Sequence, residues 1–322
     1  MTVPAHGDPV PSSWPPATFG TRGWTQGTVR VLGHRLFYRS FGAPRRGVLL
    51  TLHGGPGATH DYLLPLADLA RDGYRVVFFD QLGCGRSEVP RSATEYTVER
   101  YTEEVEAVRR ALRLGRIHLV GSSWGGLLAL SVARTYPASL QSLVTIGGIA
   151  DIPLAEREMR RLRNRLPPAA RRALDRYEAR GEFDHPAYLR ACREFYERHL
   201  CRVRPWPREL QHSLEMAARR PVYPTMNGPN EFTITGTIRY WDMSRDLGRI
   251  RTATLVTGGR YDEVTPRVAR QIHEGIPGST WVTFARSSHT PFWEERPRFM
   301  EVVARFLRAH PRAGRPRSAG AP

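Results

Sequence analysis

The sequence predicts an α/β protein, in which a mostly parallel, eight-stranded sheet is covered by helices on both faces and carries an inserted helical segment. Three observations lead to this fold class. Short runs rich in Val, Ile, Leu and Phe alternate with segments of helical spacing up to about residue 150. An Arg-rich, strand-poor stretch then interrupts the alternation, and strands and helices resume after it.

Each expected element follows from its local pattern. Two alternating runs around Gly33-His34 indicate a hairpin, and the later, continuously apolar runs are typical of buried parallel strands. The expected strands are 28–32, 35–39, 48–52, 74–79, 117–120, 143–146, 253–257 and 281–284. Helical spacing predicts helices over 62–70, 98–114, 127–135, 266–275 and 297–309.

These elements divide the chain into four parts. Residues 1–26 are rich in Pro and small polar residues, and we expect them to be loose. The ranges 27–150 and 247–310 form the core, and 151–246 form a helical cap. Residues 311–322 consist of Pro, Gly, Arg and small residues with little to bury, which predicts a disordered tail.

The charge balance is strongly basic, with a formal net charge of +17, and every basic residue is Arg. A basic surface is typical of proteins that bind nucleic acid or an acidic partner. The alternative is a GC-rich coding bias that replaces Lys by Arg throughout, and the scatter of the arginines over several expected helices favours it. We therefore expect no nucleic-acid partner.

The sequence points to a cytoplasmic protein. No apolar run approaches the length of a membrane span, and the first residues lack the basic and apolar blocks of a secretory signal. The three cysteines, Cys84, Cys192 and Cys201, have no metal-ligand or redox spacing, which suits reduced thiols. We expect no membrane partner, and a monomer or small homo-oligomer.

The hexapeptide Gly121-Ser122-Ser123-Trp124-Gly125-Gly126 lies between an expected strand and an expected helix. Gly-x-Ser-x-Gly in that position is the pattern of a nucleophile elbow, in which a strained strand-to-helix turn exposes the serine hydroxyl. Ser123 is then a candidate nucleophile. The alternative is an ordinary glycine-rich turn.

A serine nucleophile needs a base, and the base needs an orienting carboxylate. Asp262 and His289 follow Ser123 in the chain, each just after a later strand, which is the order found in α/β-hydrolases. The sequence therefore predicts the triad Ser123, Asp262 and His289 on an α/β-hydrolase fold. In the alternative interpretation, Asp262 caps a helix and His289 is a loop residue.

Attack on a carbonyl also requires donors for the developing oxyanion. The backbone N–H of Trp124, directly after the candidate nucleophile, is one candidate, and Gly55 in the loop after the third strand is the other. We expect His53 to structure that loop. The full dinucleotide, P-loop and His-Glu-x-x-His patterns are missing, so we expect no cofactor and no metal.

Four motifs together closely resemble the proline iminopeptidases, in particular the branch with the tricorn-interacting aminopeptidase and amino-acid amidases. The motifs are His53-Gly54-Gly55-Pro56-Gly57, Asp80-Gln81-Leu82-Gly83-Cys84-Gly85-Arg86-Ser87, Gly121 to Gly126, and Gly228-Pro229-Asn230-Glu231-Phe232. The resemblance runs from about Gly27 to about Leu307. Ser122 stands where many members have Gly, which leaves the mechanism unaffected.

The resemblance implies that two glutamates, Glu231 and Glu263, hold the free amino group of the substrate's first residue. Paired carboxylates suit an α-ammonium, because they provide both acceptors and charge. Alternatively, Glu231 pairs with one of the many arginines and Glu263 faces solvent. Aromatic side chains near strand ends are candidates for an apolar pocket or for plain core: Trp124, Tyr223, Tyr240, Trp241, Phe292 and Trp293.

The predicted function is a serine aminopeptidase that releases one N-terminal residue, proline or another apolar amino acid, through an acyl-enzyme. Its substrate is a peptide or an amino-acid amide with a free N-terminus. An amino-acid amidase or esterase, or a peptide-tailoring hydrolase of a biosynthetic pathway, would use the same catalytic residues. A binding protein without turnover is a third hypothesis, which the complete set of catalytic residues opposes.

Overall fold

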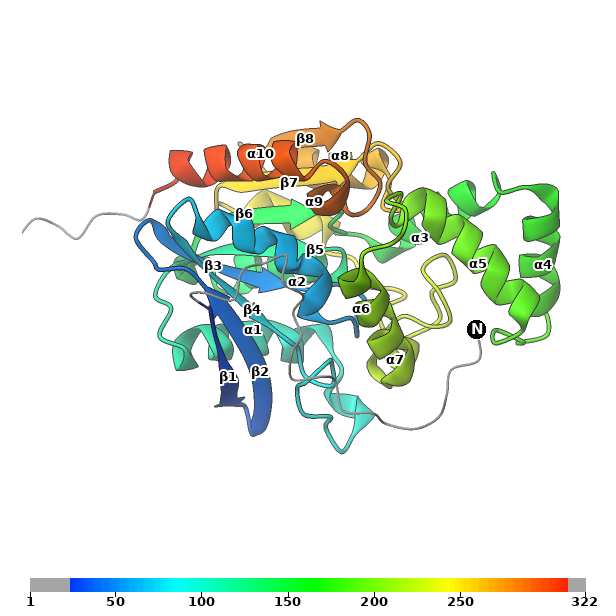
Figure 1. The fold of residues 1–322 in the computed structure, drawn as a ribbon, viewed down its shortest axis with the longest axis horizontal. Helices are drawn as coiled ribbons and strands as arrows, with labels where there is room; N and C mark the ends of the chain where they lie inside the picture. Colours follow the sequence, from blue (N-terminus) through cyan, green and yellow to red (C-terminus); the bar gives the residue numbers. More distant parts are fainter. Residues whose placement is uncertain (1–23, 312–322) are drawn as a thin grey trace, which may run out of the picture.

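A computed structural model of the protein describes residues 24–311, and the order of strands in its sheet is β1-β2-β4-β3-β5-β6-β7-β8 (Figure 1). The strands are β1 Trp24–Val31, β2 His34–Phe41, β3 Gly47–Leu52, β4 Tyr74–Phe79, β5 Ile117–Ser122, β6 Leu140–Ile146, β7 Thr254–Gly259 and β8 Thr280–Phe284. Strands β1, β2 and β4 pair antiparallel, and the pairs from β4 to β8 are parallel. The expected eight-stranded, mostly parallel sheet is confirmed.

The first strand begins earlier than expected. Its ladder pairs Trp24 with Phe41 and Gln26 with Arg39, so residues 24–26 belong to β1 and the expectation of a loose segment up to residue 26 is wrong there. Cross-strand pairing decides this start, because the run Trp24-Thr25-Gln26 lacks the apolar alternation that marks a strand. Residues 1–23 and 312–322, where we expected a loose start and a disordered tail, lie outside the described residues.

Helices cover both faces of the sheet, as an α/β fold requires. Apolar side chains of α1 (Val98–Ala111), α2 (Trp124–Thr135) and α8 (Pro266–Gly275) pack into one core cluster. The 3₁₀ helix η2 (His60–Ala70) and α10 (Arg296–Ala309) pack into a second cluster. The segment around Tyr62 to Ala70 was expected to be helical, and it forms a 3₁₀ helix that contains Pro65.

The chain between β6 and β7, described throughout, is helical for most of its length. Its helices are α3 Ile152–Arg163, α4 Pro168–Glu178, α5 Pro186–His199, α6 Arg208–Arg219, α7 Val222–Met226 and the 3₁₀ helix η5 Ser244–Arg249. Figure 1 shows α4 and α5 beyond the end of the sheet. In residues 24–311, no helix combines the length and the apolar content that a membrane span requires.

Three shorter elements complete the description. The 3₁₀ turns η3 Ala93–Glu95 and η4 Pro137–Ser139 precede α1 and β6, and α9 Pro291–Glu294 precedes α10. The parallel strands all end at the same edge of the sheet, so the loops after β3, β5, β7 and β8 meet there. The cap chain covers this edge.

Candidate active site

Ser123 stands at the turn between β5 and α2, in a backbone conformation that residues other than glycine rarely adopt. Its φ is 58° and its ψ is −123°. The turn is tight, since a Cβ on Gly125 would overlap the carbonyl oxygen of Leu52, and one on Gly121 would overlap that of Gly125. The Ser123 N–H donates to the carbonyl of Ile146 at 2.8 Å. A residue held in this way presents its hydroxyl outward from the sheet edge.

Asp262 and His289 lie together at the same edge. The Nδ1–H of His289 donates to Oδ1 of Asp262 at 2.6 Å, and Oδ1 also accepts from the Val264 N–H at 2.8 Å. Both side chains are buried, at 1% and 3% exposure. This bond leaves Nε2 of His289 free to face the cavity that Ser123 also lines. An imidazole oriented by a carboxylate beside a serine can act as a general base.

Gly55 and Trp124 both lie beside Ser123. Trp124 is the first residue of α2, so its N–H has no partner within the helix. Gly55 lines the same two cavities as Ser123 and has a φ of 110°. The preceding N–H, that of Gly54, donates to the Tyr62 hydroxyl at 2.8 Å. Two backbone N–H groups in this position can stabilise an oxyanion.

A buried side-chain amide links the two segments that carry these donors. Gln81, directly after β4, accepts from the Trp124 indole N–H at 2.8 Å and donates to the carbonyl of His53 at 2.9 Å. Its backbone N–H donates to Nε2 of His53 at 3.0 Å. Burial lowers the pKa of His53 to about 4, so the ring is neutral and serves as an acceptor. Sequence reasoning did not identify Gln81, although a polar residue just after a strand end was a usable signal.

Glu231 and Glu263 reach the site from different parts of the chain. Glu231 belongs to the cap segment after α7, and its Oε1 accepts from the Tyr223 hydroxyl at 2.6 Å. Glu263 follows Asp262, is 2% exposed, and its Oε1 lies 3.9 Å from Nε2 of His289. Its Oε2 is buried without a hydrogen-bond partner among the described residues. Neither alternative expected from the sequence is found, because Glu231 pairs with no arginine of residues 24–311 and Glu263 does not face solvent.

The protonation of these groups reflects burial and mutual repulsion. Burial raises the pKa of Glu231, which the Tyr223 hydrogen bond lowers in part. Burial also raises the pKa of Glu263 well above its usual range, and the negative charges of Glu231 and Asp262 add to the rise. Burial opposes the charged form of His289, but the carboxylates of Asp262, Glu263 and Glu231 outweigh it and raise its pKa to about 9.

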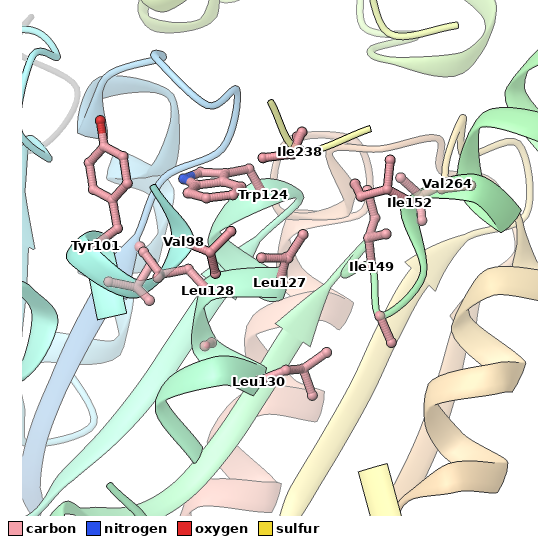
Figure 2. Close-up of a cluster of buried hydrophobic side chains, with 14 of the residues drawn as sticks. Val98, Tyr101, Trp124, Leu127, Leu128, Leu130, Ile149, Ile152, Ile238 and Val264 are labelled. Carbon is pink, nitrogen blue, oxygen red and sulfur yellow. The ribbon is translucent and has the colours of Figure 1, made fainter. Parts of the chain in front are cut away.

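Two cavities meet at Ser123, Gly55 and Glu231. The first, of about 50 Å³, contains His289 and Glu263 and is closed by apolar residues of the cap. The second, of about 10 Å³, contains Trp124 but not His289. Figure 2 shows Trp124 and Leu127 of α2 beside Ile149, Ile152, Ile238 and Val264, which come from three other segments and enclose this second space.

The aromatic residues considered for a pocket divide between these cavities and other places. Trp124 lines the second cavity and Tyr223 the first. Phe292 is fully buried against Phe299 and Tyr62, and the Trp293 indole donates to the Tyr62 carbonyl at 2.8 Å. Trp241 packs against the core and Tyr240 is 75% exposed. Phe292, Trp293, Trp241 and Tyr240 line neither of these two cavities, and their place in a substrate pocket stays a prediction.

The last residue of α5 holds two of the site loops. The carbonyl of His199 accepts from the Glu263 N–H at 3.1 Å and from the His289 N–H at 3.2 Å. Its ring Nδ1–H donates to the Tyr261 carbonyl at 2.8 Å. A cap helix thereby fixes the backbone of both residues.

A larger cavity of about 540 Å³ lies on the outer side of Asp262. Exposed arginines of α3, α5 and the loop after β7 line it, and Ser123 does not. Its size alone does not make it the reaction site, because it contains neither the candidate nucleophile nor the base. In residues 24–311, no group of three or more His, Cys, Asp or Glu side chains is arranged to hold a metal ion.

Comparison with known proteins places this site in a family. Residues 47–296 match the α/β hydrolase fold family, a range that contains all the candidate residues above. The proline iminopeptidase of Thermoplasma volcanium is 45% identical over 87% of this chain and 96% of its own. The chain belongs to the proline iminopeptidase family.

Solved structures agree with this membership of the proline iminopeptidase family. The crystal structure of the proline iminopeptidase of Mycobacterium smegmatis has a TM-score of 0.83 and 37% identity, covering 89% of this chain and 98% of its own. The crystal structure of VinJ has a TM-score of 0.86 and 38% identity, covering 89% and 99%. The sequence resemblance to the proline iminopeptidases is confirmed, and with it the assignment as a serine hydrolase of this kind.

Proposed function

We propose that the protein is a serine aminopeptidase that releases one N-terminal residue, proline or another compact apolar amino acid, from a peptide or amino-acid amide. The observation that carries this proposal is the pair of buried carboxylates, Glu231 and Glu263, beside Ser123 and His289. Membership of the proline iminopeptidase family supports it.

The two glutamates bind the substrate's α-ammonium. They have no arginine partner among the described residues, and Glu263 Oε2 still lacks a hydrogen bond. A buried carboxylate in this state is stabilised by a cation that brings N–H donors, which an α-ammonium does. An N-acylated substrate lacks both the charge and the donors, so the site selects free N-termini.

The first residue occupies the narrow apolar cavity. The ammonium lies beside Glu231 and Glu263, and the leaving amine takes its proton from His289, so both groups lie in the cavity that contains Glu263 and His289. The other cavity, lined by Trp124, Ile149, Ile152 and Val264, then takes the first side chain. Its free space of about 10 Å³ is no more than one water needs, so the surrounding side chains must move apart to admit even a compact apolar group such as the proline ring.

The reaction proceeds in two halves. His289 Nε2 takes the proton of Ser123 as the hydroxyl attacks the carbonyl, and Asp262 stabilises the imidazolium. The N–H groups of Gly55 and Trp124 bind the oxyanion, where each donor contributes on the order of 10²–10³ in rate. His289 then protonates the leaving amine, and a water activated by the same ring releases the amino acid from the acyl-enzyme.

Paired substrates test this function directly. The p-nitroanilides of proline, alanine and leucine should be hydrolysed with a preference for the smallest apolar residues, and their N-acetylated versions should not be. The Ser123→Ala variant should abolish both hydrolysis and labelling by a fluorophosphonate. Equal turnover of free and acetylated substrates would contradict the proposal. A screen of dipeptides, amides and esters then separates peptidase from amidase and esterase activity.

A further inference from the structure

The active site contains three carboxylates but only one group that can carry a positive charge. Asp262 lies 2.6 Å from Nδ1 of His289, and Glu263 lies 3.9 Å from its Nε2. Glu231 lines the same cavity as Glu263 and His289. Apart from His289, these carboxylates have no ion-pair partner in the part of the chain that the structure describes. The free site is therefore short of positive charge.

The other titratable groups around this cluster do not supply a cation. Burial raises the pKa of Tyr62 to about 12 and those of Tyr196 and Tyr223 well above their usual value, so the phenols stay neutral. Burial lowers the pKa of His199 and raises that of Glu294, so neither adds positive charge near neutral pH. Within the part of the chain that the structure covers, the imidazole of His289 is left as the one site where the cluster can hold a cation.

A protonated His289 cannot act as the base for Ser123. Isolated charges are costly to bury, and burial raises the pKa of Glu263 well above its usual range, so Glu263 stays ionised in the free enzyme only with the imidazolium of His289 beside it. The rise of the His289 pKa to about 9 agrees with this pairing. Near neutral pH the free enzyme thus holds its base in the unreactive form.

We propose that the substrate's own ammonium group activates the base: by taking the place of the imidazolium beside Glu231 and Glu263, it releases His289 as a neutral imidazole. This inference rests on the proposed function and adds a second role to the two glutamates. One positive charge replaces another, so the charge of the buried site is conserved. The proton leaves Nε2 of His289 for solvent, and no other bond changes.

The mechanism explains selectivity in a way that anchoring alone does not. A substrate without an amino group finds His289 protonated as well as an empty ammonium site. Removing the negative charge nearest to Nε2 should then relieve the inhibition for a substrate that never needed the ammonium site. Glu263 is that charge, and Glu263→Gln keeps its shape.

Hydrolysis of p-nitrophenyl acetate, an ester without an amino group, tests the inference. At pH 7 we expect Glu263→Gln to hydrolyse it about tenfold faster than the natural enzyme, the change that one pKa unit on His289 produces. The acid limb of its pH profile should move to lower pH. The same variant should lose activity on proline p-nitroanilide. If the folded Glu263→Gln variant hydrolyses the ester at an unchanged or slower rate, the inference is overturned. Glu263 would then serve only to bind the substrate ammonium.

Proton release on binding provides a second measurement, which does not depend on turnover. Calorimetric titration of Ser123→Ala with prolinamide at pH 8, in buffers of different ionisation enthalpy, should show close to one proton released per ligand bound. The nitrogen NMR shifts of the His289 imidazole should change on binding from those of the charged ring to those of the neutral ring, because a proton released by Glu263 alone would leave them unchanged. Binding without proton release would overturn the inference. Failure of the proposed function is a different result, namely equal turnover of free and N-acetylated anilides. Glu301→Gln, an exposed change on α10, is the matched control in both experiments.

Discussion

The two walls around Ser123 differ in how their polar groups are paired. On the core wall, the indole of Trp124, the amide of Gln81 and the ring of His53 form a chain of hydrogen bonds between 2.8 and 3.0 Å. On the cap wall, Glu263 Oε2 has no hydrogen-bond partner within the described residues, and Glu231 is held by the Tyr223 hydroxyl. The polar groups named on the core wall all have hydrogen-bond partners, whereas the cap wall has a buried carboxylate oxygen without one.

This difference suggests two roles: the core wall positions the catalytic residues, and the cap wall binds the substrate. Buried polar groups that are all paired make a rigid frame, and breaking the frame costs stability. Buried carboxylates that outnumber their basic partners destabilise the free protein, and a bound cation relieves this cost. Changes in the core wall should therefore alter stability and kcat, whereas changes in the cap wall should alter KM and selectivity.

The largest effect is expected where the two walls meet, at Asp262. In Asp262→Asn the amide can no longer accept from Nδ1–H of His289 with full charge, which favours the wrong tautomer. We expect kcat on proline p-nitroanilide to fall about 10⁴-fold with the fold intact. Asp184→Asn, at an exposed site in the cap, is the control and should be unchanged. A loss below about tenfold would show that Asp262 does not orient the base.

Glu231→Gln probes the cap wall. Removing one partner of a buried charge pair costs about 2–5 kcal/mol, so kcat/KM on free-amine substrates should fall between about 30-fold and several thousand-fold. The variant should be as stable as the natural protein or more stable, because a buried carboxylate disappears. Thermal unfolding measures this second part. A clear loss of stability would place Glu231 in the structural frame instead.

Gln81→Leu probes the core wall with a side chain of similar size. The indole N–H of Trp124 and the carbonyl of His53 both lose their partner, and each unpaired group costs about 1–3 kcal/mol. We expect the free energy of unfolding, measured in urea, to fall by about 2–4 kcal/mol. The value of kcat should fall while KM and the preference for free amines stay. Gln271→Leu on α8 is the matched control, and a change of KM alone would reverse the assignment of this wall.

The smallest effect is expected for Tyr223→Phe. The tyrosine hydroxyl donates to Glu231 and so lowers its pKa, against the rise that burial causes. Without the hydroxyl the pKa of Glu231 rises further, more of the carboxyl is protonated, and the ammonium binds less well. KM should therefore rise a few-fold, more strongly as the pH falls. Profiles of KM against pH, compared with those of the exposed control Tyr240→Phe, would show no difference if Tyr223 only fills space.

Local patterns predicted the fold class and the residues beside Ser123. An elbow such as Gly121 to Gly126 is a short segment whose geometry depends on its own glycines, so the strand-to-helix turn is readable from sequence. Asp262 and His289 could be located because parallel strands bring the loops after β7 and β8 to one edge. Glu231 and Glu263 came from the family resemblance, and their roles remain a prediction.

The second cavity beside Ser123 could not be predicted in the same way. Ile234 and Ile238 line it from an irregular segment after α7, where no periodicity marks a buried face. Phe292 and Trp293 did not mark this cavity, because the Phe292 ring packs against Tyr62 and the Trp293 indole donates to the Tyr62 carbonyl. The burial of Glu263 also depended on the cap, whose position only the three-dimensional structure reveals.

The carbonyl of His199 limits how this protein can be rebuilt. It belongs to a cap helix, yet it supports the backbone of Glu263 and of His289. Cap and core are therefore not exchangeable modules, although they are separate in sequence. A chimera that takes its cap from a relative must keep the His199 carbonyl in the same position. Directed evolution of specificity should tolerate more substitutions in the segment after α7 than at the end of α5.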